Sequence, residues 1–207
     1  MFHVKHAPAV AELRAQAENL GCELDDVQAG LLLAFERLLV TWAIPQGLVA
    51  RGDAPRIRAR HVLDSLRASL VVEPRDRLAY YLGSGAGLPG IVVAVSRPSL
   101  AVQLVEARRA RVAFLEMVVA DLRLSNARVR GMRIEELAEP ADLCFARALA
   151  SPQETWRTAA PLLDRGGRLV LFLGAAAAVP RIPGIRVQLR RTSVLESAGP
   201  LAIMTRK

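Results

Sequence analysis

A glycine-rich turn is the most chemically informative segment of the chain. It reads Gly83-Ser84-Gly85-Ala86-Gly87-Leu88-Pro89-Gly90 and stands between a short β-rich run and an apolar helical stretch. Glycine accepts positive φ and lets the backbone approach a ligand, and nucleotide-like ligands bind at such turns in doubly wound sheets. The segment therefore predicts a ligand-binding crevice, with Pro89 in the first turn of the helix that follows.

The spacing of the glycines leaves two ligands open. Gly85, Gly87 and Gly90 satisfy the GxGxxG pattern of dinucleotide enzymes, whereas Gly83, Gly85 and Gly87 give the GxGxG pattern common among S-adenosylmethionine (SAM) methyltransferases. Glu106 ends the next β-rich run, where its carboxylate can accept hydrogen bonds from both ribose hydroxyls. Alternatively, Glu106 only caps the helix that follows. An adenosine-containing ligand is expected in either pattern.

A second group of polar residues shares one predicted helix, which begins near Arg56. Arg60, His61, Asp64 and Ser65 are spaced so that their side chains meet on one face. This face either closes over the crevice and contacts the substrate, or pins the helix to the sheet through Arg60 or His61 with Asp64. We expect no metal at His61, and we expect the two cysteines to be buried free thiols, because no metal-ligand spacing surrounds them.

The elements that position these residues fall into two parts. Residues 1–70 predict a helical layer whose apolar faces carry Val10, Leu13, Ala17 and Leu20, then Leu31, Leu32, Phe35, Leu38, Leu39 and Trp42. Residues 71–207 predict strands at 78–82, 101–106, 127–131, 141–146, 168–173, 185–193 and 201–205, with helices at 89–96, 107–124, 134–138 and 152–163. This alternation is typical of an α/β fold with a mostly parallel seven-stranded sheet and an antiparallel end. The two parts are expected to form one compact unit.

Composition and charge narrow the functional classes. The longest apolar stretch, Leu169 to Val179, is too short to span a bilayer, and the polar segment Met1–His6 is unlike the start of a secretory signal, so we expect a cytoplasmic protein. The formal net charge of +8 favours a polyanionic partner such as RNA or DNA. Because Lys5 and Lys207 are the only lysines, GC-rich coding is an alternative origin of the arginine excess.

In order along the chain, these segments resemble the RsmG family, also called GidB, which methylates N7 of a guanine in the 530 loop of 16S ribosomal RNA with SAM. The shared motifs are Arg60-His61-Val62-Leu63-Asp64-Ser65, Leu82 to Ile91 around the glycine turn, Arg111-Val112-Ala113-Phe114-Leu115, Arg133-Ile134-Glu135-Glu136 and Ala146-Arg147-Ala148-Leu149-Ala150. NAD enzymes do not carry the pair RHxxDS and GSGAGLPG.

The resemblance implies a Rossmann-like class I SAM-methyltransferase fold and a set of cofactor-binding residues. These are Gly83, Gly85, Gly87 and Leu88 at the turn, Glu106 at the ribose, Ile134 and Glu135 at the adenine, and Arg147 at the mouth after the fourth strand. Pairing of Arg147 with Glu135 or Glu136 is the alternative for that arginine.

On the substrate side, the resemblance implies that Arg60, His61, Asp64, Ser65 and Arg147 contact 16S rRNA in the small ribosomal subunit. No catalytic acid or base is expected, because guanine N7 has an available lone pair and the transfer requires mainly alignment. We expect a monomer without a metal or a membrane contact.

Three positions depart from the family pattern. Tyr81 stands where an acidic residue usually precedes the first glycine, the segment Trp42–Val49 lacks the usual asparagines and lysine, and Leu173-Gly174 replaces a lysine after the fifth strand. These departures keep a second hypothesis open, a non-catalytic RNA- or ribosome-binding protein on a decayed methyltransferase fold. A third, an NAD-dependent oxidoreductase, rests only on the glycine spacing.

Overall fold

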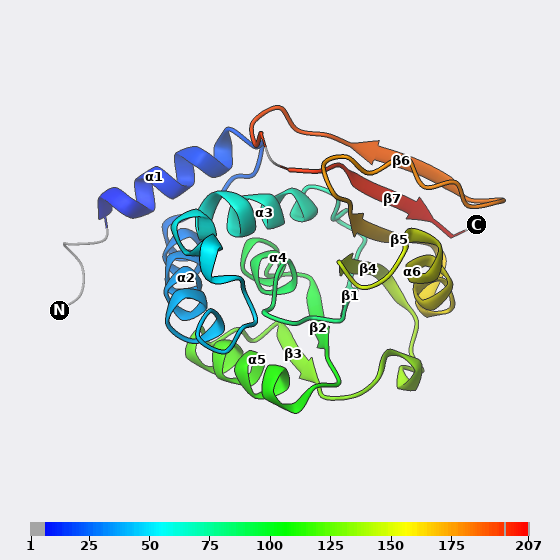
Figure 1. Cartoon of the computed structure of the whole chain (residues 1–207), viewed down its shortest axis with the longest axis horizontal. Coiled ribbons are helices and arrows are strands. Elements are labelled where there is room, and N and C mark those ends of the chain that lie inside the picture. Colours follow the sequence, from blue (N-terminus) through cyan, green and yellow to red (C-terminus); the bar gives the residue numbers. More distant parts are fainter. Residues whose placement is uncertain (1–6, 197, 207) are drawn as a thin grey trace.

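A seven-stranded sheet forms the centre of the computed structural model, which describes residues 7–196 and 198–206 (Figure 1). The strand order is β3-β2-β1-β4-β5-β7-β6. The strands are β1 (Leu78–Leu82), β2 (Ala101–Val105), β3 (Ala127–Arg130), β4 (Ala141–Arg147), β5 (Leu163–Phe172), β6 (Arg186–Arg190) and β7 (Leu201–Thr205). β1 to β5 pair in parallel, and β7 is antiparallel to both β5 and β6. The predicted sheet, including its antiparallel end, is confirmed.

The strand order places a crevice beside β1 and β4. The chain runs outward from β1 to β2 and β3, then returns to β4 on the other side of β1. At such a reversal the connections after the two central strands diverge, and ligands bind between them at the carboxyl edge of the sheet. The glycine turn follows β1 directly, and Arg147 is the last residue of β4. The fold thus brings these two sequence motifs to the same crevice.

Helices cover the two faces of the sheet unequally (Figure 1). α4 (Gly90–Ser96) and α5 (Arg109–Asp121) pack on one face together with the N-terminal helices, in one cluster of buried side chains. α6 (Pro152–Ala159), continued by the 3₁₀ turn η5 (Ala160–Leu162), packs on the other face. Successive strand residues serve opposite faces, so Tyr81 belongs to the first cluster and Tyr80 to the second. The short 3₁₀ turn η4 (Ile134–Glu136) follows β3.

The N-terminal layer consists of α1 (Ala7–Glu18), α2 (Asp26–Leu38), the π-helix η1 (Leu39–Ala43), the 3₁₀-helix η2 (Arg51–Arg56), the π-helix η3 (Ile57–Leu63) and α3 (Asp64–Ser69). A capping box fixes the start of α2, because Asp25 accepts from the Gln28 backbone N–H and Gln28 accepts from that of Asp25. Leu13, Leu32 and Phe35 are fully buried in the cluster that also contains the sheet residues. The layer therefore shares its core with the sheet.

The expected burial of Trp42 is wrong. Trp42 is 48% exposed, whereas the next residue, Ala43, is buried. The cause is the π-helical turn, in which the Ile44 backbone N–H donates to the Leu39 carbonyl oxygen at 3.0 Å. A π turn holds more residues than an α turn, so the apolar face that ends at Leu39 is rotated before it reaches Trp42.

Two further observations bear on the sequence expectations. Cys22 and Cys144 are free and buried, as predicted. Within residues 7–196 and 198–206, each helix is too short or too polar to cross a bilayer.

A buried ion pair fastens the segment before β1 to β5. Arg168 Nη2 lies 2.6 Å from Asp76 Oδ2, and these two residues are 6% and 3% exposed. Asp76 Oδ2 also accepts from the Glu73 backbone N–H at 2.6 Å. Removal of one partner of a buried pair leaves the other charge without compensation. Loss of Asp76 is therefore expected to destabilise the chain far more than loss of one partner of an exposed pair.

Asp76→Ala is expected to lower the free energy of unfolding by about 3 kcal/mol, the lower end of the range for a broken buried pair, because the buried Arg168 guanidinium then keeps only the exposed Glu73 carboxylate, 3.1 Å from its Nη1. Arg75→Ala, which removes the exposed ion pair with Glu73, is the matched control and should cost less than about 1 kcal/mol. Urea denaturation of both variants measures the two values. Equal losses would contradict the burial of the Arg168–Asp76 pair.

Candidate active site

The glycine turn is tight on its helix side and open on the side of the crevice. Gly83, Gly85 and Gly87 have φ values of 69°, 53° and 85°, as the glycine pattern predicts. A Cβ at Gly87 would lie 2.7 Å from Ile91 Cγ1, so packing requires glycine there as well. At Gly85 a Cβ would meet only the Gly83 carbonyl oxygen, at 3.9 Å. The backbone at Gly85 is thus accessible to a ligand.

Glu106 connects this turn to the start of α5. The residue is 6% exposed, and its Oε2 accepts from the Gly85 backbone N–H at 3.0 Å. Its Oε1 accepts from the backbone N–H of Arg108, the residue that caps α5, at 2.9 Å. Glu106 therefore does contact the N-cap of α5, as the capping alternative predicts, and it also holds the glycine turn. Each carboxylate oxygen has a second lone pair, which leaves acceptors for the hydroxyls of a ligand.

A cavity of about 310 Å³ lies against the turn. Of the residues expected to bind the cofactor, Gly83, Gly85, Leu88 and Arg147 line it, and Glu106 adjoins it through Gly85. Gly87 faces α4 instead. The remaining lining residues are Leu48, Val49, Ala50, His61, Tyr81, Ser84, Ala86, Arg111 and Ala148.

The groups around this cavity fit the polar ends of SAM. Nη1 of Arg147 is buried and has no hydrogen-bond partner among the described residues, and a buried guanidinium N–H needs an acceptor such as a carboxylate. At the other end, Glu106 offers acceptors suited to ribose hydroxyls. Arg147 therefore brings a guanidinium suited to a carboxylate to the lining of this cavity, and Glu106 beside it has acceptors suited to a ribose.

Ile134 and Glu135 lie outside this cavity. They form η4 after β3, where Ile134 is half-buried against the α6-side cluster and Glu135 is exposed. The structure does not bring either side chain to the lining. Their assignment to the adenine stays a prediction.

Arg147 is held by Asp64, a partner that the sequence alternatives did not include. Its Nη2 lies 3.2 Å from Asp64 Oδ2 and donates to the Arg60 carbonyl oxygen at 3.3 Å. Its guanidinium carbon lies 5.4 Å from the centre of the Phe172 ring, a cation–π distance. The proposed pairing of Arg147 with Glu135 or Glu136 is wrong, because those carboxylates lie on the separate turn after β3.

Arg60 and His61 pair with Asp53 in η2, and not with Asp64 as the pinning alternative proposed. His61 Nε2 lies 3.0 Å from Asp53 Oδ2, and Arg60 Nη1 lies 3.5 Å from Oδ1. The π-helical turn of η3 separates Asp64 from these two side chains.

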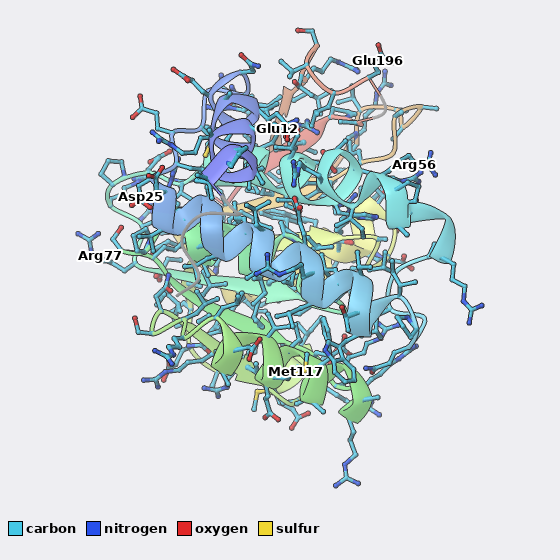
Figure 2. All side chains as sticks on the ribbon, turned by 90° about the vertical axis from the view of Figure 1, so that its left-hand side faces the viewer. Glu12, Asp25, Arg56, Arg77, Met117 and Glu196 are labelled. Atoms are coloured by element: carbon cyan, nitrogen blue, oxygen red, sulfur yellow. The ribbon has the colours of Figure 1, made fainter. Side chains whose placement is uncertain are left out.

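Figure 2 shows Arg56, the last residue of η2, and Arg77, which precedes β1, on opposite sides of the molecule. The Asp53 cluster thus belongs to the side toward which the parallel strands run.

A second cavity, of about 590 Å³, shares Arg147 and Ala148 with the first as lining residues. Arg60, Asp64 and Arg147 line it from one side. Its other walls include Phe172, Leu173 and Gly174 after β5, with Ala198 and Gly199 before β7. Ser65, also expected on the substrate side, is fully buried and lines neither cavity. The structure therefore gathers three of the predicted substrate residues, places His61 at the neighbouring cavity and separates Ser65 from both.

Ala148 marks the junction with an unusual backbone. Its φ is 51°, a left-handed conformation that is uncommon for a residue with a Cβ. Such conformations concentrate at binding and catalytic sites, where the surrounding fold enforces them. The sequence has no glycine at this position to signal the turn.

His61 is favoured in its neutral form. Burial lowers its pKa below the ordinary value for an imidazole, the cations of Arg147 and Arg60 lower it further, and the hydrogen bond to Asp53 raises it. Since the folded-state pKa is depressed, His61 contributes stability that is fully present above the pKa of the unfolded chain and is lost as pH falls through the folded-state pKa.

Asp53→Asn should lower the pKa of His61 still further, because it removes both the carboxylate acceptor and its negative charge, the two effects that raise that pKa. NMR titration of the His61 ring protons measures it, and the spectrum of His61→Gln identifies the signal. A higher pKa in Asp53→Asn would contradict the observed pairing.

Comparison with known proteins identifies the family. Residues 28–179 match the family model GidB, described as rRNA small subunit methyltransferase G. The protein named ribosomal RNA small subunit methyltransferase G from Acidiphilium cryptum is 42% identical over 149 residues, which cover 70% of this chain and 68% of that one. The protein of the same name from Ralstonia nicotianae is 36% identical over 194 residues, or 88% and 87% of the two chains.

The fold agrees with this relationship. A SAM-dependent methyltransferase structure from Aquifex aeolicus matches with a TM-score of 0.58 at 15% identity, covering 79% of this chain and 98% of that one. The predicted Rossmann-like SAM-methyltransferase fold is confirmed. Because the family model spans the RHxxDS segment, the glycine turn, Glu106 and Arg147, the chain belongs to the rRNA small subunit methyltransferase G family.

Proposed function

We propose that this chain transfers a methyl group from SAM to N7 of a guanine in 16S rRNA, within the 530 loop, as a cytoplasmic monomer. The observation that carries the proposal is the junction of two cavities at Arg147 and Ala148. One cavity adjoins the glycine turn and Glu106, and the other is lined by Arg60 and Asp64. This arrangement suits a cofactor and a target base that must meet at one point.

The first cavity would hold the cofactor by its two polar ends. Bound SAM supplies an electrophilic methyl group on its sulfonium. Glu106 would accept from the ribose hydroxyls while Gly85 and Arg108 keep its carboxylate in place. Arg147, which lines this cavity, would pair its guanidinium with the methionine carboxylate. Ile134 and Glu135 would contact the adenine of the cofactor.

The second cavity would receive the target guanine. Because N7 of guanine carries an available lone pair, the residues of the chain have to align the base and exclude water, and these effects can supply up to about 7–11 kcal/mol of barrier reduction. Leu171 and Phe172 give this cavity an apolar wall, and Asp64 with Arg60 gives it a polar one. A flipped-out base needs both kinds of contact to offset its lost stacking, which costs a few kcal/mol.

A non-catalytic RNA-binding protein is the second candidate, and the surroundings of Tyr81 favour it. Tyr81 is 3% exposed, and its hydroxyl donates to the Leu88 carbonyl oxygen. The described residues that line the first cavity include neither aspartate nor glutamate. An ammonium group of the cofactor would therefore meet no carboxylate among the lining residues, since the proposal assigns Glu106 to the ribose. Affinity for SAM decides between the candidates.

The test combines SAM binding with methyl transfer. The unmodified chain is expected to bind SAM in calorimetric titration and to transfer radiolabelled methyl groups to small ribosomal subunits or protein-free 16S rRNA. Nuclease digestion then locates the modified guanine. Binding of RNA without affinity for SAM would establish the non-catalytic candidate instead.

Glu106→Gln is expected to weaken SAM binding by about tenfold or more, because hydrogen bonds to a charged group contribute about 1.5–3 kcal/mol each. Glu116→Gln, the same change at an exposed position of α5, is the matched control and should leave the affinity unchanged. An equal affinity in both variants would show that the ligand does not use Glu106.

A further inference from the structure

One segment of the chain carries arginines without any acid to balance them. Between Asp164 and Glu196 the sequence contains six arginines and no lysine, aspartate or glutamate, so residues 165–195 hold +6 of the formal net charge of +8. Arg168 is buried with Asp76. The other five are exposed: Arg165, Arg181, Arg186, Arg190 and Arg191.

β6, at the outer edge of the sheet, carries two of these arginines, and Arg191 follows its last residue directly. We call Arg186, Arg190 and Arg191 the β6 arginines. Val187 and Leu189 pack against the α6-side cluster, so the alternate residues of the strand, Arg186 and Arg190, point to the other face and are exposed. At about 3.3 Å per residue, they stand about 13 Å apart along the strand. Figure 1 shows β6 at the rim of the molecule, next to β7.

The end of this row lies beside the proposed base cavity. Arg190 pairs with Leu201, which pairs with Phe172, a lining residue of that cavity. With neighbouring strands about 4.8 Å apart, the Arg190 backbone lies about 10 Å from that of Phe172. β6 therefore ends beside the cavity, and Arg186 at its start lies farther away.

Arg67 fixes this end of β6 to the site. Its side chain is 5% exposed, and Nη2 donates to the carbonyl oxygens of Gly199 at 2.9 Å and Arg190 at 3.3 Å. Its Nη1 lies 2.6 Å from Asp64 Oδ1. The same carboxylate holds Arg147. A ligand bound along β6 would consequently be in a fixed position relative to both cavities.

We propose that the β6 arginines bind the phosphate groups of the RNA strand that flanks the target guanine. This inference rests on the proposed function. Arginine suits the role because its planar guanidinium binds phosphate with two parallel hydrogen bonds. The family model ends at residue 179, so the match itself assigns nothing to β6. Charges on an edge strand also prevent pairing with other sheets, but that role does not require a position beside the cavity.

The experiment measures binding of protein-free 16S rRNA as a function of salt. In the test variant, Arg186, Arg190 and Arg191 are all changed to Gln. The control variant changes Arg37, Arg128 and Arg157 to Gln, which removes the same charge from exposed positions on α2, β3 and α6. The test variant should reduce the slope of log affinity against log salt by about 2 to 3, since each phosphate contact contributes about 0.7 to 0.9. The control should change it by less than one such contact, and both variants should bind SAM as the unmodified chain does.

The outcomes separate this inference from the proposed function. Equal losses of slope in the test and control variants would overturn the inference, even where the unmodified chain methylates RNA. A loss confined to the test variant would support it, even where no methyl transfer is found. Arg190 also donates to the Leu70 carbonyl oxygen, so its replacement could disturb the fold. The double variant Arg186→Gln with Arg191→Gln keeps Arg190, and its salt slope should fall by the contribution of about two phosphate contacts. Self-association of that variant with an unchanged slope would assign the arginines to edge protection and overturn the inference.

Discussion

The carboxylate of Asp64, buried between two guanidinium groups, is the interaction on which the site depends. Oδ1 lies 2.6 Å from Arg67 and Oδ2 lies 3.2 Å from Arg147. Burial of these charges costs several kcal/mol per ion unless their geometry compensates it. Asp64 contacts both arginines, and Arg67 also donates to the carbonyl oxygens of Gly199 and Arg190. Through Arg67 it joins α3 to the end of β6, and through Arg147 it joins α3 to β4. The helical layer, the centre of the sheet and its antiparallel edge therefore meet at a single carboxylate.

Glu106 has the corresponding role on the other side of the crevice. Its two oxygens join the glycine turn after β1 to the entry of α5 after β2. Both carboxylates are more than nine-tenths buried, yet each stands at the border of a cavity. Acids in this position orient donors and still offer lone pairs to a ligand. The same groups thus stabilise the connections of the sheet and define where a ligand can bind.

The sequence predicts the sheet well because its strands are short apolar runs separated by breakers. β1 and β7 have the expected bounds, 78–82 and 201–205. Positions whose environment depends on tertiary geometry are predicted poorly. Trp42 is exposed because a π turn shifts the helical phase, which periodicity does not reveal. Helical spacing also fails to predict that Arg60 and His61 pair with Asp53, because a π turn lies between them and Asp64. Asp53 is the only acid within residues 51–60, a segment with four arginines. That local charge pattern is the signal that could have identified it.

Tyr81 shows why loss of a typical polar residue and loss of the fold are separate questions. The tyrosine is buried, its hydroxyl donates to the Leu88 carbonyl oxygen, and a Cβ at Gly90 would lie 2.7 Å from its Cδ1. It therefore supports the glycine turn from the sheet side, and burial raises the pKa of its hydroxyl, which keeps it a neutral donor. Since the turn, Glu106 and Arg147 retain their positions around the cavity without an acid at residue 81, the change bears on the affinity for one charged group of the cofactor. The architecture that brings the two cavities together therefore does not require an acid at residue 81.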